Sequence, residues 1–166
     1  ELLDAYYDCI IPPILERGGE VLKFTGDGVL AIFQDGSGSG TCQMCRGHAL
    51  EAALEGQACL DVLDTTRWGE DVEVKAGIAL HHGEVAFGNV GSGERLDFTV
   101  IGKDVNLAAR IGAKCRTLGE PVLMSEAFAE QLCSGSTYLG DFPLRGLPGT
   151  HDIYVPERSA GGARRV

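Results

Sequence analysis

The sequence predicts an α+β sandwich, with helices packed over a largely antiparallel sheet. Short strand-like runs joined by Gly-rich turns indicate hairpins, while longer Ala- and Leu-rich runs have helical spacing. This mixture of hairpins and crossovers argues against a Rossmann arrangement. The 166 residues, 44% hydrophobic and 23% charged, suffice for one domain with a buried core. We expect that domain to cover residues 1–157, followed by a disordered Gly/Ala/Arg-rich tail over 158–166.

The chain opens on a predicted helix, Leu2–Leu15, whose apolar side chains recur at helical spacing. Pro12 and Pro13 lie inside this run and should kink or interrupt it. Two β-prone runs on either side of the turn at 26–28 then predict a hairpin over 20–33.

A Gly/Ser loop over 34–41 separates this hairpin from an Ala- and Leu-rich helix over 42–64. The loop lacks the Lys-Ser/Thr pair that follows a phosphate-binding loop, so we interpret it as a linker. Ser125 is expected to cap a short helix. Six later strands are predicted, over 71–80, 84–90, 96–101, 121–124, 137–144 and 152–155. Two later helices are predicted, over 105–117 and over 127–132, the second of which is the short helix after Ser125.

The composition argues against several classes of function. A formal net charge of -10 does not suit a surface that binds nucleic acid. The chain contains no run of 18 apolar residues that would predict a membrane span, so we expect no membrane contact from this segment and a cytoplasmic location.

The N-terminus lacks the basic start and apolar run of a signal peptide and has the pattern of a helix already under way. We therefore expect further sequence upstream of Glu1.

The cysteines and histidines show no spacing typical of a metal site. Cys42 and Cys45 form a CxxC, but no second Cys or His pair lies at zinc-finger spacing, so we interpret them as ordinary thiols. Six cysteines without a disulfide framework favour a reducing compartment. The histidines are interpreted as structural or exposed; they are His48, His81, His82 and His151.

The Gly26-Asp27-Gly28 turn offers a candidate metal ligand. Asp27 places a carboxylate at a tight bend, and such oxygens suit Mg²⁺, a hard cation that also takes substrate phosphates. Asp-Gly turns are common without any function, so the turn alone leaves both interpretations open. Lys23 lies on the preceding strand, where it would either point to solvent or donate a hydrogen bond to a ligand.

A second polar pair lies on the predicted helix that follows Gly102. Asn106 and Arg110 are spaced i, i+4 and share one helix face, and the small Ala108 and Ala109 between them leave space beside the pair. Arg offers a planar fork of donors and Asn both donates and accepts, a combination that binds an anion or a sugar. A solvated helix face is the alternative for this motif in isolation.

Five segments come in an order and spacing that resemble a known family: 23–28 (KFTGDG), 83–85 (GEV), 88–91 (GNVG), 96–102 (LDFTVIG) and 105–110 (VNLAAR). They resemble the class III adenylate/guanylate cyclases, over about Glu1 to Val155. The resemblance implies a ferredoxin-like, palm-type sandwich that lacks its first strand. It also implies a homodimer, paired head to tail, with ATP bound at active sites in the interface.

The resemblance implies a role for each matching residue. Asp27 matches the second of two aspartates that together hold two metal ions, Mg²⁺ or Mn²⁺. Lys23 matches the adenine-selecting lysine, and Thr99 matches the Asp/Thr position of a bacterial subgroup, a combination that favours ATP over GTP. Asn106 and Arg110 match the pair that positions the ribose and stabilises the transition state.

The metal site departs from the family pattern. The family's first metal aspartate lies on a strand upstream of the opening helix, and this chain begins after that strand. We therefore expect an N-terminally truncated domain that is inactive, or nearly so, by itself. In the family geometry Asp27 serves one site of the dimer, while Lys23, Thr99, Asn106 and Arg110 serve the opposite one.

Other functions stay open beside an adenylate cyclase. An inactive regulatory domain of the same family would bind ATP without turnover and would equally lack the first aspartate. A diguanylate cyclase shares a Gly-Asp hairpin, but residues 26–29 do not supply its Gly-Gly-Asp/Glu-Glu-Phe-like turn.

Three further charged residues have no clear match in the cyclase pattern. Arg145 lies near the family's phosphate-binding basic position, in a loop that does not align clearly, and Glu84 and Asp97 have no catalytic counterpart in the family. Upstream or downstream regulatory domains are the expected partners.

Overall fold

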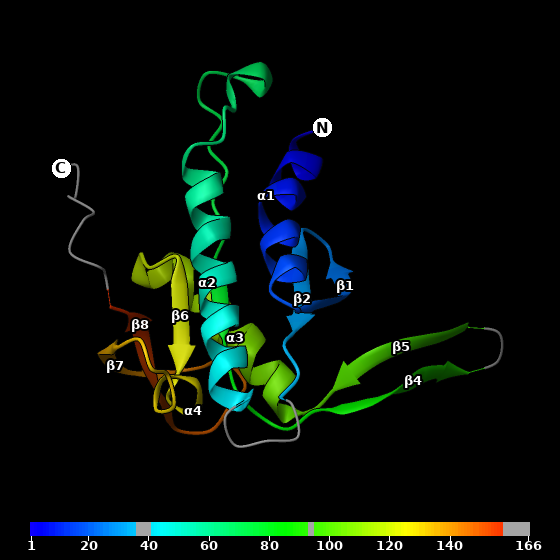
Figure 1. Ribbon diagram of the computed structural model, residues 1–166, viewed down its shortest axis with the longest axis vertical. Helices are drawn as coiled ribbons and strands as arrows, with labels where there is room; N and C mark the ends of the chain where they lie inside the picture. The colour runs from blue at the N-terminus through cyan, green and yellow to red at the C-terminus, as the bar shows by residue number, and fades with distance from the viewer. Residues whose placement is uncertain (36–40, 93–94, 158–166) are drawn as a thin grey trace.

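The structure is a computed structural model that describes residues 1–35, 41–92 and 95–157 (Figure 1). The predicted tail and most of the Gly/Ser loop lie outside the described residues, so those predictions stay untested. The helices are α1 (Leu2–Glu16), α2 (Thr41–Asp61), α3 (Lys103–Leu118) and α4 (Glu126–Ala129), with a 3₁₀ turn at Thr66–Trp68. The strands are β1 (Glu20–Thr25), β2 (Gly28–Ile32), β3 (Ile78–Leu80), β4 (Ala86–Ser92), β5 (Arg95–Ile101), β6 (Val122–Ser125), β7 (Ser136–Pro143) and β8 (Thr150–Pro156).

The strands form three sheets in the described part of the chain. The β1–β2 hairpin and the β4–β5 ribbon are each antiparallel pairs, and the ribbon extends away from the rest of the molecule (Figure 1). The four-stranded sheet has the order β3-β6-β8-β7, in which β3 and β6 are parallel and the other pairs antiparallel. The predicted α+β class, with helices packed on a mixed sheet, is confirmed.

The core lies on both faces of the four-stranded sheet. Val122 and Met124 of β6 pack with Leu50 and two alanines of α2, Ala49 and Ala53. Leu123, between them in sequence, packs on the opposite face against Ile111 of α3. Alternate residues of a strand point to opposite faces, and all three of these β6 residues are buried. This central strand therefore anchors α2 and α3 on either side of the sheet.

One predicted strand is shorter in the structure. The alternating pattern over 71–80 predicts a full strand, but only Ile78–Leu80 pairs, against β6. The alternating apolar residues before this strand are still packed, because Val74 and Ala76 contact the hydrophobic cluster between α1 and α2. The Gln57 side-chain amide donates to the Ala76 carbonyl at 2.8 Å, so a helix side chain takes the place of a ladder partner there.

The prolines do not interrupt the first helix. α1 runs unbroken through Pro12 and Pro13, where the sequence predicts a kink or a break. Cys9 and Ile10 are buried against Leu60 of α2, so packing holds the last turns of α1 despite the lost backbone donors. None of the helices in the described part has the length and apolarity that crossing a bilayer requires.

A disulfide joins α1 to α2. Cys9 and Cys59 are 50 residues apart in sequence, and their Cα atoms lie 5.4 Å apart in the structure. The interpretation of the cysteines as an unlinked set is therefore wrong for this pair. The disulfide forms because the two helices pack side by side in the tertiary structure (Figure 1). The spacing of cysteines in the sequence does not reveal this proximity.

Reduction of this disulfide is expected to lower stability. The bond closes a loop of about 50 residues in the unfolded chain, for which about 2–4 kcal/mol is typical, or roughly 5–15 °C in Tm. Thermal unfolding with and without dithiothreitol measures the difference. The double variant Cys9→Ala/Cys59→Ala is the control and should not respond. An equal response of the parent and the double variant would contradict the prediction.

Candidate functional site

The hairpin turn presents Asp27 to solvent. Thr25 pairs with Gly28, so Gly26 and Asp27 form a two-residue turn, and Gly26 has the positive φ of +67° that such a turn requires. The Tyr7 hydroxyl of α1 donates to the Gly26 carbonyl at 3.2 Å. The predicted hairpin with its tight turn is thus confirmed, and α1 braces the turn from one side.

Aromatic residues of α1 extend this support. The Tyr7 ring meets the Phe24 ring edge-on, with centroids 4.9 Å apart. Burial and the nearby Asp27 charge both raise the pKa of Tyr6. Asp27 itself is exposed, and its carboxylate has no hydrogen bond or ion pair among the described residues. The carboxylate is therefore free to take a ligand.

The donor set at this turn fits one metal ligand, not a complete site. Within the described residues no group of three or more His, Cys, Asp or Glu side chains is arranged to hold a metal ion. Mg²⁺ is commonly held by one or two carboxylates, with substrate phosphates and waters completing its octahedron. Asp27 suits that chemistry as one carboxylate of a shared site.

Lys23 and Thr99 lie on neighbouring strands. Lys23 is exposed on β1, opposite Leu30 and beside an irregularity in the register at Val21. Thr99 lies on β5 opposite Gly88, and its side chain is outside the described part of the structure. β1 and β5 contact each other, so the backbone brings together the two strands that carry the predicted adenine-binding residues. Their roles stay predictions.

Asn106 and Arg110 lie on the exposed face of α3. The helix begins directly after β5, separated from it by Gly102. Its opposite face is held in the core by Ile111 and Cys115, which are fully or almost fully buried. The predicted pairing on one helix face is confirmed as geometry, and both side chains are open to solvent. A ligand that approaches this face meets an amide and a guanidinium one turn apart.

The elements that carry these residues are connected to one another. β1 contacts β5, β5 leads into α3, and α3 carries Asn106 and Arg110. Arg145 lies exposed in the loop between β7 and β8. Asp27 lies at the far end of the hairpin that carries Lys23.

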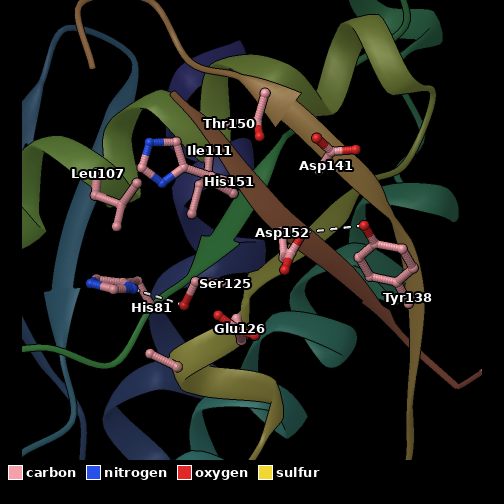
Figure 2. Close-up of a pocket in the computed structure, with 11 residues that line it drawn as sticks. His81, Leu107, Ile111, Ser125, Glu126, Tyr138, Asp141, Thr150, His151 and Asp152 are labelled. Atoms are coloured by element: carbon pink, nitrogen blue, oxygen red, sulfur yellow. Dashed lines mark hydrogen bonds between the residues drawn. The ribbon is translucent and has the colours of Figure 1, made fainter. Parts of the chain in front are cut away.

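A separate cavity of about 400 Å³ lies beside β8, α3 and α4 (Figure 2). Its lining includes the carboxylates of Glu126, Asp141 and Asp152, and no Lys or Arg. The Tyr138 hydroxyl donates to Asp152 at 3.1 Å across it. This negative lining does not suit a triphosphate, and none of the predicted site residues borders the cavity.

Comparisons with known proteins agree with this geometry. No family model matches the chain. It is 34% identical over 135 residues to an adenylate cyclase of Anabaena cylindrica, covering 78% of this chain and 25% of that protein. It is 32% identical to an uncharacterized protein of Mycobacterium tuberculosis, covering 98% of this chain and 29% of that protein. The chain therefore spans roughly a quarter of the length of these curated relatives.

Solved structures share the fold. A bacterial light-regulated adenylyl cyclase superposes with a TM-score of 0.77 at 26% identity, covering 94% of this chain and 44% of that one. The adenylyl cyclase CyaB of P. aeruginosa gives a TM-score of 0.78 at 24% identity, over 95% of this chain and 81% of that one. The guanylyl cyclase Cya2 gives 0.73 at 24% identity, over 92% and 77%. The last two likenesses establish fold alone, and they include both nucleotide specificities.

Proposed function

Because the chain belongs to the class III adenylyl/guanylyl cyclase family as a catalytic domain, we propose that it converts ATP to 3′,5′-cyclic AMP and pyrophosphate in a head-to-tail homodimer. The observation that carries the proposal is the path from β1 through β5 to α3, with Asn106 and Arg110 exposed at its end. This path supports the proposal because the elements that carry the residues assigned to base recognition and to charge stabilisation are connected.

Adenine selection is assigned to Lys23 and Thr99. A lysine ammonium donates hydrogen bonds and accepts none, so it pairs with acceptor positions of a base, such as the ring nitrogens of adenine. A threonine hydroxyl both donates and accepts, and can receive a hydrogen bond from the exocyclic amine. The adenylate cyclase of Anabaena cylindrica, at 34% identity, supports ATP over GTP.

The reaction is an in-line displacement at the α-phosphorus. The ribose 3′ hydroxyl releases its proton to solvent, and its oxygen forms a bond to the α-phosphorus. The bond from that phosphorus to the oxygen that bridges it to the β-phosphorus breaks, and pyrophosphate leaves. Asn106 orients the ribose by donating and accepting hydrogen bonds. Arg110 donates to the α-phosphate oxygens as negative charge develops on them, from a helix whose other face is packed in the core.

Asp27 is the residue that would hold a divalent cation, Mg²⁺ or Mn²⁺. Such an ion, when bound, lowers the pKa of the attacking hydroxyl and neutralises phosphate charge. A complete two-metal site would need a second acidic ligand besides Asp27. A cytoplasmic location stays a prediction. The Cys9–Cys59 disulfide argues against it, because disulfides are rare in reducing compartments.

Activity of the full-length protein that carries this chain tests the proposal. The purified protein, with Mg²⁺ or Mn²⁺, is expected to form cyclic AMP from ATP faster than cyclic GMP from GTP. The Asn106→Ala variant is the matched control for contaminating activity. A folded dimer that makes neither product, or a variant as active as its parent, overturns the proposal.

A second candidate is a nucleotide-binding regulatory domain without turnover. The observation that favours it is the turn at Asp27, because the described residues there form no group of three or more His, Cys, Asp or Glu side chains that could hold a metal ion. Calorimetry separates the two functions: the regulatory domain binds ATP, and the nucleotide is recovered unchanged.

A further inference from the structure

A buried polar network connects the end of β3 to the start of α3. The His81 side chain is 8% exposed, and its Nδ1 lies 2.7 Å from the Ser125 hydroxyl at the end of β6 (Figure 2). Its Nε2 faces the carboxylate of Asp104, whose Oδ1 is 3.4 Å away. This second contact is too poorly directed for a hydrogen bond and is electrostatic. The histidine assigned from sequence as structural or exposed is thus buried and partnered.

The neighbouring groups fix the proton arrangement of His81. The Ser125 oxygen accepts from the Phe128 amide as the cap of α4, so its hydroxyl proton is free to go to Nδ1. The ring proton then lies on Nε2, toward the carboxylate of Asp104. Burial lowers the pKa of His81, which keeps this ring neutral at neutral pH. Each group then has a compatible partner or faces a compatible charge.

Asp104 holds the loop after β3 with its other oxygen. The Glu84 amide donates to Asp104 Oδ2 at 2.9 Å. The approach is close enough to restrict residue 83: a Cβ on Gly83 would lie 2.5 Å from Asp104 Cγ. Glycine at this position follows from the fit of the carboxylate against the backbone, not from turn geometry.

The first turn of α3 has little other support. Its N-cap is Gly102, which has no side chain to accept from the free amides, and the first-turn bond from Asn106 to the Gly102 carbonyl is 3.4 Å long. Asp104 lies in this turn, two residues before Asn106, where a negative charge also stabilises the helix dipole. The turn that begins the catalytic face is therefore tied to the sheet through Asp104.

We propose that Asp104 is a positioning residue for the cyclase reaction: its link to the Glu84 amide and to His81 sets where Asn106 and Arg110 meet the substrate. This inference rests on the proposed function. Asp104 touches neither substrate nor metal in this role. It acts through the first turn of α3, and displacement of that turn by about 1 Å is the kind of change that costs up to 100-fold in rate.

The test compares substitutions of Asp104 in the full-length protein. Asp104→Ala removes both links, and we expect kcat to fall roughly 10- to 100-fold with KM for ATP within about twofold of the parent. Asp104→Asn keeps an oxygen for the Glu84 amide and should recover most of kcat. Gly83→Ala, which pushes the carboxylate away, should reproduce the loss and serves if Asp104→Ala does not fold.

A control separates positioning from simple destabilisation. Cys115→Ala creates a small cavity under the other end of α3 and should lower Tm while leaving kcat unchanged. Equal kcat values for the parent, Asp104→Ala and Gly83→Ala would overturn the positioning role alone and leave the proposed function standing. Absence of cyclic nucleotide formation by the parent would overturn both.

Discussion

Substitution of Arg110 by alanine is expected to lower kcat for cyclic AMP formation in the full-length protein by roughly 100-fold, the typical cost of one positioned donor to a charged transition state. The guanidinium is exposed on α3 and lies outside the core, so Tm should change by no more than about 2 °C. KM for ATP should rise little, because the donor acts mainly on charge that develops during the reaction. Steady-state kinetics and thermal unfolding measure both quantities.

The control for this substitution is another arginine on the same helix. Arg116 is also exposed on α3, but it lies six residues beyond Arg110, about 120° away around the helix and roughly 9 Å further along its axis. Arg116→Ala removes the same charge from the domain and should leave kcat within about twofold. A similar loss in both variants would assign the effect to net charge and contradict the role of Arg110.

Features that depend on neighbours in sequence could be predicted. The turn at Asp27 follows from glycines on either side of it, and the helix at Asn106 follows from spacing that the α-helical repeat imposes. Ser125 was identifiable as a cap because a hydroxyl before a short helix satisfies a free amide, and the structure shows its bond from Phe128. In each case the energy that decides the structure is local.

Features that depend on distant contacts could not be predicted. The Cys9–Cys59 disulfide requires knowing that α1 and α2 pack side by side. The shortened strand at Ile78 depends on which partner strand is available, not on its own alternation. His81 and Asp104 are 23 positions apart, and neither has a neighbouring residue type that signals their contact. The one local pattern near this contact is the His-His-Gly sequence at 81–83, and such a sequence occurs in many turns without a buried histidine.

The proposed division of the site between two subunits predicts the second large effect, complementation between two inactive variants. If Asp27 serves one site and Arg110 the other, Asp27→Ala and Arg110→Ala proteins should each be nearly inactive alone. A mixed dimer then has one site with both defects and one site with neither. Random reassociation makes half of the dimers mixed, so an equimolar mixture should regain about a quarter of the parent activity.

Co-expression of the two variants with different affinity tags isolates the mixed dimer and sharpens the test. That dimer alone should have about half of the parent's kcat per dimer and an unchanged KM for ATP, because its one intact site is complete.

The control pairs Lys23→Ala with Arg110→Ala, two residues assigned to the same site, so that each site of their mixed dimer carries one defect. No recovery in the Asp27 mixture would show that Asp27 and Arg110 of one chain work at a single site. Recovery in the control would show that Lys23 and Arg110 of one chain work at different sites. Either result contradicts the assignment. The two pairs differ only in which end of the β1–β2 hairpin is changed, Lys23 on the strand or Asp27 at the turn. The comparison therefore measures directly whether one hairpin contributes to two active sites.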